Sequence, residues 1–449
     1  MIASVAWVEE YDRGSPVRAG EIIAIGSELL LGGRLDTNSL FLTEQLASVG
    51  VEVRFKSVVG DVEADIAAAI RTAARRAKVM VLTGGLGPTR DDCTRQAVAR
   101  VTGRPLRRQP EAMESMRQRL AEWGRTPTGP QLRQALIPSG AEVLDNPVGS
   151  APGFCLSWKG CLVVALPGVP AEAERTFAGS VAPKLSSGSA GQARLQRRVL
   201  HTFGLPESDV ERRLTGVVRA GSDVRLGLLA SPLGVTVSLT AWEGRLNTAR
   251  TQGVSDLARL ARTVRVRLGR FVYAEGTDTM EEVVGRHLAA RRVTLAVAES
   301  CTGGLIGHRL TQVAGSSGYL DRVAVCYSDR AKVDLLGIPE ALIRRHGAVS
   351  AEVAAAMAHG IRSRSQAGVG LSVTGIAGPT GGTAQKPVGL VYVGLNAPAF
   401  RNAEAKADDG SLTREFRFHG DRQAIKLRAS QAALEMLRQW LVTTGSRGR

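Results

Sequence analysis

The sequence lacks any long hydrophobic run, so it offers no segment that could cross a membrane. Its 449 residues contain apolar runs only of strand length, such as Cys161 to Leu166. A membrane-spanning helix needs about 18 such residues or more. The amino terminus carries Glu9, Glu10 and Asp12 where a secretory signal would be basic and then apolar. We expect a cytoplasmic protein of about three domains, since a domain usually holds roughly 150 residues.

Cysteine is also sparse. The five cysteines include no C-x-x-C pair, which argues against a disulfide framework and against a zinc site. Several stand in apolar, strand-like segments, where a buried and inert thiol is the usual state. They are Cys93, Cys155, Cys161, Cys301 and Cys326.

Lysine and aromatic residues are few, although the chain is basic. Lys and Arg number 58 against 42 Asp and Glu, a formal charge of +16, but only eight of the cations are lysines. Aromatic residues make up 4% of the chain, and the arginines are scattered. A nucleic-acid-binding protein concentrates its charge on one face or arm. We therefore expect no nucleic-acid or membrane partner. Background use of arginine is the first explanation of the positive charge, and the binding of small anionic substrates is the second.

What the chain does have is a regular alternation of short apolar strands with helices. This pattern predicts βαβ units and a parallel sheet over residues 20–185. Small residues from 186 to 191 mark a linker, residues 192–275 form a small α+β connector domain, and residues 276–445 alternate again. Residues 1–19 have no periodicity and are taken as an extension. The predicted fold class is α/β, with two three-layer α/β domains of mostly parallel sheets joined by the connector.

A glycine-rich loop, Thr83-Gly-Gly-Leu-Gly-Pro-Thr-Arg-Asp-Asp92, follows a predicted strand and leads into a helix expected from about residue 91. Its glycines allow backbone N–H groups to approach a ligand, and a helix N-terminus favours an anion. Asp91 and Asp92 could hold Mg²⁺ against phosphate oxygens. The loop matches neither GxGxxG nor the P-loop, which disfavours a Rossmann or Walker site. A plain turn with an acidic first helical turn is the structural alternative.

The motifs around this loop are similar to those of the molybdopterin-binding (MoaB/MogA-like) domain of the CinA family. In that family the domain is associated with metal-dependent ADP-ribose pyrophosphatase activity. The resemblance implies a divalent metal such as Mg²⁺ bound by Asp91, Asp92 and Glu28, although Ser27 stands where some relatives have Asp. It also implies phosphate binding by Thr83, Gly84, Gly85, Gly87 and Thr89. The motifs are Gly26-x-Glu28-Leu29-Leu30-x-Gly32, Asp36-x-Asn38, Gly60-Asp61, the loop itself, Ala151–Phe154 and Leu166–Pro170.

Further glycine-rich turns lie toward the carboxyl terminus. The strand predicted at 293–298 ends in Glu299-Ser-Cys-Thr-Gly-Gly304, with a helix near Leu305, and a later strand ends in Thr374-Gly-Ile-Ala-Gly-Pro379. A serine there needs a base to take its proton, and no histidine lies in these motifs. A lysine whose pKa is lowered by burial can serve instead.

Lys332 is the candidate base, because this chain otherwise uses arginine for charge and arginine cannot deprotonate. A solvated helix lysine remains the alternative. Cys301 is the rival nucleophile, because a thiol at a helix N-terminus has a lowered pKa.

The carboxyl-terminal motifs resemble the CinA C-terminal domain and are similar to nicotinamide mononucleotide (NMN) deamidase. They read ESCTGGLI, GSSGY, YSDRAK, GAVS, VTGIAGPTGG and KPVG. The resemblance implies Ser317 as nucleophile, Lys332 as base and Tyr327 as assisting group, with no cofactor. Asp329 replaces the asparagine usual in the family's Tyr-Ser-Asn motif. The substrate-binding residues implied are Ser300, Cys301, Thr302, Gly303, Gly304, Gly315, Ser316, Gly375, Ala377, Gly378 and Pro379.

The resulting hypothesis is a homodimeric CinA-like protein that converts NMN to nicotinic acid mononucleotide and ammonia. Its N-terminal domain would cleave ADP-ribose with a metal. Two alternatives stay open: a non-catalytic binding protein of competence or DNA-damage responses, which only the basic charge supports, and a molybdopterin-binding protein.

Overall fold

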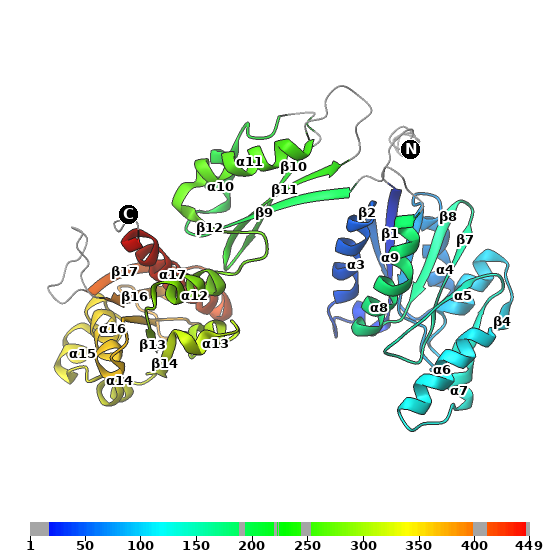
Figure 1. The fold of residues 1–449 in the computed structure, drawn as a ribbon. Helices are drawn as coiled ribbons and strands as arrows, with labels where there is room; N and C mark the ends of the chain where they lie inside the picture. The colour runs from blue at the N-terminus through cyan, green and yellow to red at the C-terminus, as the bar shows by residue number, and fades with distance from the viewer. Residues whose placement is uncertain are drawn as a thin grey trace. The chain divides into compact units, whose positions relative to one another are not determined.

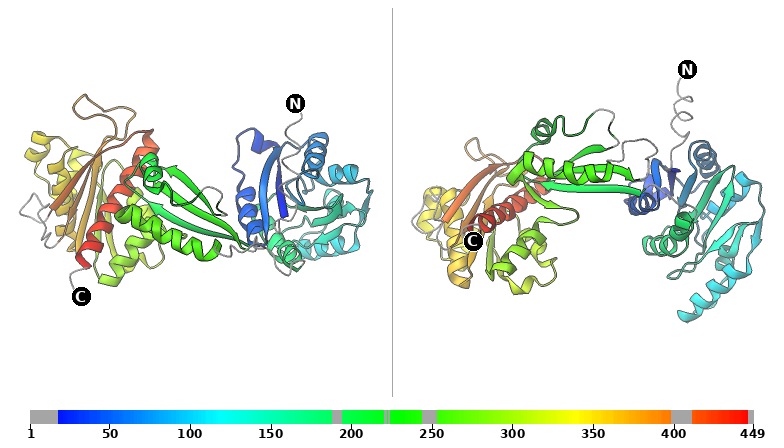
Figure 2. Two further views of the ribbon diagram at one scale, coloured as in Figure 1. Left: turned by 90° about the horizontal axis from the view of Figure 1, so that it is seen from above. Right: turned by 45° about the horizontal axis from the view of Figure 1, so that its top comes forward.

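The computed structural model describes residues 18–187, 194–219, 222, 224–243, 253–397 and 411–445. Its contacts divide the chain into two compact units, residues 1–196 with 241–254 and residues 197–240 with 255–449. Each unit is considered by itself below (Figures 1 and 2). Residues 1–17 of the predicted extension and most of the predicted linker lie outside the described residues, whereas Arg18 and Ala19 already belong to the first strand. Within the described residues, no helix is long and apolar enough to cross a membrane.

The first unit is built on a six-stranded sheet with the order β2-β1-β3-β8-β7-β6. The first four of these strands run parallel, whereas β7 and β6 add antiparallel pairs at one edge. A separate two-stranded sheet pairs β4 with β5. The strands are β1 Arg18–Ile25, β2 Val51–Val59, β3 Val79–Thr83, β4 Leu106–Arg108, β5 Leu136–Pro138, β6 Glu142–Leu144, β7 Gly153–Trp158 and β8 Cys161–Leu166.

Both faces of this sheet are covered, because successive apolar residues of a strand point to opposite sides. Ile23 of β1 faces one core, with side chains of α4, α5 and α6, whereas Ile22 faces the other, with side chains of α3 and of the segment from α8 to α9. The unit is therefore a three-layer α/β sandwich. The helices are α2 Ser27–Leu30, α3 Thr37–Ser48, α4 Glu63–Ala73, α5 Thr94–Thr102, α6 Pro110–Glu122, α7 Gly129–Leu132, α8 Pro170–Thr176 and α9 Ala182–Ser187.

The second unit begins with a small α+β segment. Its four strands have the order β10-β11-β9-β12, with antiparallel pairing of β10 to β11 and of β12 to β9. Its elements are β9 Arg194–Thr202, α10 Glu207–Leu214, β10 Arg225–Ser231, β11 Gly234–Glu243, α11 Gly253–Leu268 and β12 Val272–Glu275.

The rest of the second unit holds a five-stranded sheet with the order β14-β13-β15-β16-β17. β14, β13 and β15 are parallel, and β16 and β17 follow as antiparallel strands. The strand β17 is not among those that the sequence pattern predicts. The strands are β13 Leu295–Glu299, β14 Leu320–Val325, β15 Val369–Gly375, β16 Leu390–Asn396 and β17 Ser411–Arg417.

Helices cover this sheet on both faces as well. Leu295 and Val297 of β13 pack in a core with α12, α13 and α17, whereas Ala296 and Ala298 pack in a second core with α14, α15 and α16. Figure 2 shows α17, in red, on the other side of the sheet from the yellow helices. The helices are α12 Met280–Arg291, α13 Leu305–Thr311, α14 Asp329–Leu336, α15 Glu340–His346, α16 Ala351–Ser365 and α17 Arg422–Gly445. Both large units thus have the predicted α/β layering.

The stability of the first unit depends on an ion pair between a buried carboxylate, Glu21, and a part-exposed arginine, Arg76. Glu21 of β1 is fully buried and accepts hydrogen bonds from Arg76 Nε at 2.8 Å and Nη2 at 2.7 Å, and from Ser57 Oγ at 2.8 Å. We expect Arg76→Ala to lower the free energy of unfolding by about 2 kcal/mol, because it leaves a buried charge without its main partner. Arg76 is itself part-exposed, so the loss should stay below that of a fully buried pair.

Urea unfolding of Arg76→Ala beside Arg100→Ala is the measurement, since Arg100 pairs with Glu63 at an exposed site. Equal unfolding midpoints in the two variants would contradict the role given to Glu21.

Candidate active site

A cavity of about 200 Å³ lies where the three parallel strands of the second unit end. Ser300 and Cys301 follow β13, Tyr327 follows β14, and Thr374 and Gly375 end β15. The carboxyl ends of parallel strands are the usual place for ligands in open α/β sheets. The remaining lining residues are Asp329, Lys332, Ala348, Val349, Ala377 and Arg422.

Lys332 is buried in the wall of this cavity. It lies on α14, whose first turn is capped by the Ser328 hydroxyl, which accepts from the backbone N–H of Ala331 at 3.1 Å. The residue is 1% exposed, and its Nζ donates to the carbonyl of Tyr327 at 3.3 Å. Burial lowers the pKa of Lys332, and the Asp329 carboxylate, 3.8 Å from Nζ, partly opposes this. Lys332 is therefore a buried amine with a lowered pKa and not a solvated helix lysine, and its role as a base stays a prediction.

Ser300 and Cys301 share the cavity with Lys332. The Ser300 backbone is fixed by its N–H, which donates to the Val373 carbonyl at 2.9 Å. Burial raises the pKa of the Cys301 thiol to about 12, so the expectation of a reactive, low-pKa thiol at a helix N-terminus is wrong. Both residues are almost wholly buried, and each contributes to the lining of the cavity.

Ser317 does not reach this cavity within the chain. Ser317 precedes β14, whereas Tyr327 and Lys332 follow it. Since β14 pairs with β13 from Leu320 to Val325, its six residues at about 3.3 Å each separate the two ends. The predicted Ser317–Lys332 dyad is thus not brought together, and Gly315 and Ser316 stand at the same distant, amino-terminal edge of the sheet.

The turn after β13 does not offer its helix N-terminus to a phosphate. Glu299 is fully buried, and its carboxylate accepts from the backbone N–H groups of Gly304 at 2.9 Å, Ile306 at 3.2 Å and Gly307 at 2.8 Å. These are the groups that an anion would use. Thr302, Gly303 and Gly304 therefore shape a turn that is already capped by the protein's own carboxylate.

Two cations at the start of α17 supply positive charge near the cavity instead. Arg422 lines the cavity and donates from Nη1 to the Gly378 carbonyl at 2.5 Å and from Nη2 to the Tyr327 hydroxyl at 3.0 Å. Lys426 is one turn further along the helix, and a Cβ added to Gly303 would lie 3.5 Å from its Nζ. The sequence hypothesis missed both, because nothing sets Arg422 apart in an arginine-rich chain.

The glycine-rich turn after β15, residues 374–379, also contributes to this cavity. Gly375 and Ala377 line it, and Gly378 and Pro379, joined by a cis peptide bond, follow directly. Tyr327 is 60% exposed, and its hydroxyl faces Arg422, whereas its carbonyl faces Lys332.

In the first unit, the predicted phosphate loop is packed tightly against its own sheet. A Cβ at Gly84 would lie 2.1 Å from the Ile25 carbonyl oxygen, and one at Gly85 would lie 2.2 Å from Thr94 Oγ1. Thr83 Oγ1 donates to the Pro167 carbonyl at 3.1 Å, and buried Arg95 donates to the carbonyls of Leu86 and Gly87. Internal packing thus accounts for these glycines, and phosphate binding by the loop stays a prediction.

The predicted metal ligands are not gathered into one cluster. Among the described residues, no group of three or more His, Cys, Asp or Glu side chains is placed to hold a metal ion. Asp92 accepts from the backbone N–H of Thr89 at 2.8 Å and from its hydroxyl. The helix α5 begins at Thr94, so Asp91 and Asp92 precede it and do not form its first turn. Together with Glu28, they do not fit a preformed metal site.

Three family models match consecutive parts of the chain. The Probable molybdopterin binding domain matches residues 21–187, the Damage-inducible protein CinA KH domain residues 197–274, and the CinA C-terminal domain residues 277–441. A putative competence-damage inducible protein of Moorella thermoacetica is 42% identical over 417 residues, which are 93% of this chain and 97% of that protein. The chain belongs to the CinA family. The resemblance found from its motifs is thereby confirmed.

Two further relatives differ in how much of this chain they cover. A CinA-like protein of Gemmatimonas aurantiaca is 39% identical over 422 residues, 93% of this chain and 95% of that protein. A solved competence/damage inducible protein of Agrobacterium tumefaciens is 39% identical, with a TM-score of 0.33, and covers 37% of this CinA chain and 97% of its own.

Substitution of Glu299 should cause a large loss of stability. We expect Glu299→Ala to lower the free energy of unfolding by about 3 kcal/mol, because several buried N–H groups lose their acceptor. The same change at Glu340, in the exposed first turn of α15, should stay within about 0.5 kcal/mol. Chemical denaturation of both variants measures this, and a cost below about 1 kcal/mol at Glu299 would contradict the capping role.

Proposed function

We propose that the C-terminal part of this CinA protein hydrolyses the carboxamide of NMN to nicotinic acid mononucleotide and ammonia. The observation that carries the proposal is a buried lysine with a lowered pKa in one cavity with a serine hydroxyl. A neutral amine near a serine is the arrangement of a Ser-Lys hydrolase. The family resemblance supports the substrate.

Ser300, not Ser317, is the proposed nucleophile. Its Oγ attacks the carboxamide carbon while Lys332 Nζ takes the hydroxyl proton. The same nitrogen then returns a proton to the leaving ammonia, and water hydrolyses the acyl-serine ester. Ser300 supports this role by its place between a strand and a helix, where a sharp turn presents a nucleophile.

The developing oxyanion requires a donor beside the nucleophile. In strand–turn–helix hydrolases the backbone N–H of the next residue is such a donor, which here is Cys301. This gives Cys301 a role through its backbone, consistent with a thiol that burial keeps protonated.

The phosphate of NMN is proposed to bind at Arg422 and Lys426. A guanidinium can hold phosphate oxygens bidentately, and the long helix α17 adds its positive end nearby. The neighbouring N-terminus of α13 is not available for this task, because the Glu299 carboxylate occupies its donors.

A nucleic-acid-binding role is less well supported. The CinA KH match covers residues 197–274, but this stretch contains no G-x-x-G sequence. That loop is what KH domains use to clamp a nucleic-acid backbone. We therefore favour the amidase as the function of the second unit.

Substitution of the two serines separates the candidate nucleophiles. Ser300→Ala and Lys332→Ala should each lower kcat for ammonia release from NMN by about 10³-fold or more, whereas Ser317→Ala should keep most of it. Coupled ammonia assays on the three full-length variants give the answer. Loss in Ser317→Ala with retention in Ser300→Ala would overturn the assignment.

The pH profile tests Lys332 as the base. Only the neutral amine accepts a proton, so kcat/KM should rise about tenfold per pH unit and level off above the pKa of Lys332. Because burial lowers that pKa, the plateau should begin below the ordinary lysine value of 10.5. The neighbouring Asp329 carboxylate raises the same pKa, so Asp329→Asn should move the rise to lower pH. A profile that Asp329→Asn leaves unchanged would argue against Lys332.

Substitution of Arg422 should affect KM only for a substrate that carries a phosphate. Arg422→Ala should raise KM for NMN by about 10–100-fold, since a charge-assisted hydrogen bond is lost. Nicotinamide riboside, which lacks the phosphate, is the matched control substrate and should show little change. An equal effect on both substrates would mean that Arg422 only holds Tyr327 and Gly378 in place.

A further inference from the structure

Asp329 is the one carboxylate among the described residues that line the Lys332 cavity. It is the first residue of α14, and its side chain is 65% exposed, so it lies on the solvent side of the cavity. A carboxylate in such a wall either has a cation of the chain as its partner or is open to a cation from outside. Its partners therefore decide what it can do.

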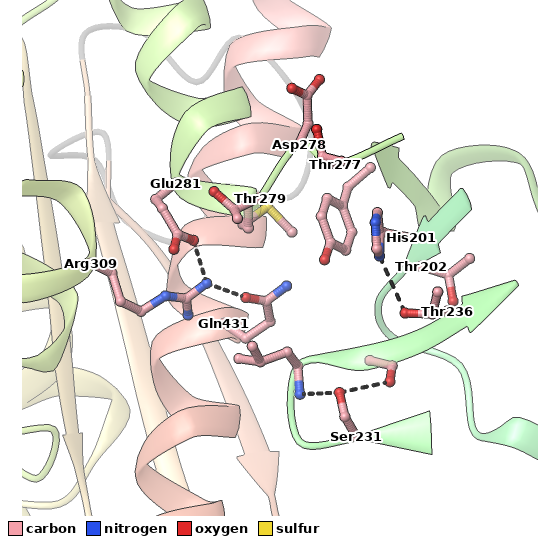
Figure 3. A pocket seen from close by; sticks show the side chains of 14 residues that line it. His201, Thr202, Ser231, Thr236, Thr277, Asp278, Thr279, Glu281, Arg309 and Gln431 are labelled. Atoms are coloured by element: carbon pink, nitrogen blue, oxygen red, sulfur yellow. Dashed lines mark hydrogen bonds and ion pairs between the residues drawn. The ribbon is translucent and has the colours of Figure 1, made fainter. Parts of the chain in front are cut away.

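The other cavity of this unit contains two carboxylates that the chain itself neutralises. This cavity has a volume of about 230 Å³ and shares no lining residue with the Lys332 cavity. Figure 3 shows Glu281 directed at Arg309, and Glu281 Oε2 lies 2.7 Å from Arg309 Nη2. Asp278 of the same wall pairs with Arg286 at 2.6 Å. Both carboxylates already have a guanidinium at hydrogen-bond distance.

Asp329 has no partner of this kind. Among the described residues, the one cation within ion-pair distance is Lys332, whose Nζ is 3.8 Å from Asp329 Oδ1 and thus beyond hydrogen-bond reach. Arg422, the other cation of the lining, donates to the Gly378 carbonyl and the Tyr327 hydroxyl. If Lys332 is the base, its amine is neutral when the substrate arrives. The charge of Asp329 then has no counter-charge from the chain.

The nicotinamide ring of NMN carries the charge that is missing. The ring is a pyridinium, so the group that bears the carboxamide is itself a cation. A carboxamide held beside Ser300 and Lys332 brings this ring into the cavity that Asp329 lines. Opposite charges attract without direct contact, and they do so more strongly in a partly buried cavity than in bulk water.

We propose that Asp329 is a specificity-determining residue, which makes the cavity prefer a nucleotide with a cationic pyridinium ring to the same nucleotide with an uncharged ring. The inference rests on the proposed amidase function, which sets the position of the carboxamide. A carboxylate in the first turn of a helix also suits the helix dipole. A role confined to the helix would change the binding of both nucleotides alike, so the two roles are distinguishable.

The probes are NMN and its dihydro form, which has the same phosphate and carboxamide but an uncharged ring. Both are titrated calorimetrically into the full-length chain with Ser300→Ala, so that neither is consumed. Asp329→Asn should weaken the binding of NMN by about threefold, within the range of an exposed ion pair, and leave the dihydro form unchanged. Asp329→Glu, which keeps the charge, should retain the preference for NMN.

The effect of Asp329→Asn on Lys332 does not imitate this result. Loss of the carboxylate favours the neutral amine of Lys332, which by itself would help a cationic ring to bind. The expected loss of NMN affinity has the opposite sign.

Asp334→Asn is the matched control. It removes an exposed carboxylate from the same helix, but one that pairs with Arg330 and does not line the cavity. Both affinities should stay as they are. Added salt is a second measurement that needs no variant at Asp329. Because both nucleotides carry the phosphate, screening should reduce only the part of the preference for NMN that comes from the ring charge.

Four results would overturn the proposal: an unchanged preference in Asp329→Asn, an equal loss for both nucleotides, the same loss in Asp334→Asn, or no binding of either nucleotide. If Asp329→Asn unfolds, as circular dichroism would show, a preference that salt does not reduce overturns it. Failure of the amidase gives a different result, since the unaltered chain would release no ammonia from NMN while the preference in binding persists.

Discussion

The bonding of the Glu299 carboxylate to the first amides of α13 is the constraint on which the candidate site depends. It joins the end of β13 to the start of the next helix and so fixes the turn between them. That turn holds Ser300 and Cys301 in the wall of the cavity. The cap also occupies the donors that an anionic substrate would otherwise use. In the proposed amidase the phosphate of the substrate would then bind elsewhere, and Arg422 and Lys426 are two cations near the same turn.

Much of the layering could be predicted from the sequence, because β-strand and helix periods differ and each strand is short. Glu21–Gly26 and Val293–Ala298 correspond closely to β1 and β13. The starts of helices are less well determined by the sequence: α5 begins at Thr94, after the acidic pair, since Asp92 binds back to Thr89 within the loop. A carboxylate beside a helix in sequence need not lie in its first turn.

The failure of the Ser317–Lys332 pairing has a simple topological reason. Residues that precede a strand and residues that follow it lie at opposite edges of the sheet. Ser317 precedes β14, and Lys332 follows it, so the order along the chain already contained this signal. Ser300 follows a parallel neighbour of the same strand and therefore shares an edge with Lys332. What sequence could not supply was the burial of Cys301 and the position of Arg422, since both depend on how α17 packs over the sheet.

The scarcity of lysine draws attention to Lys332 and equally to Lys386. The two residues differ in the hydrogen bonds and the burial of their side chains. Lys386 Nζ donates to the carbonyls of His346 at 2.6 Å and Val349 at 2.7 Å. These two hydrogen bonds give Lys386 a structural task beneath the wall formed by Val349. Lys332 has one carbonyl at the longer distance of 3.3 Å and is almost wholly buried. Burial lowers the pKa of Lys332, which is the property that a general base requires.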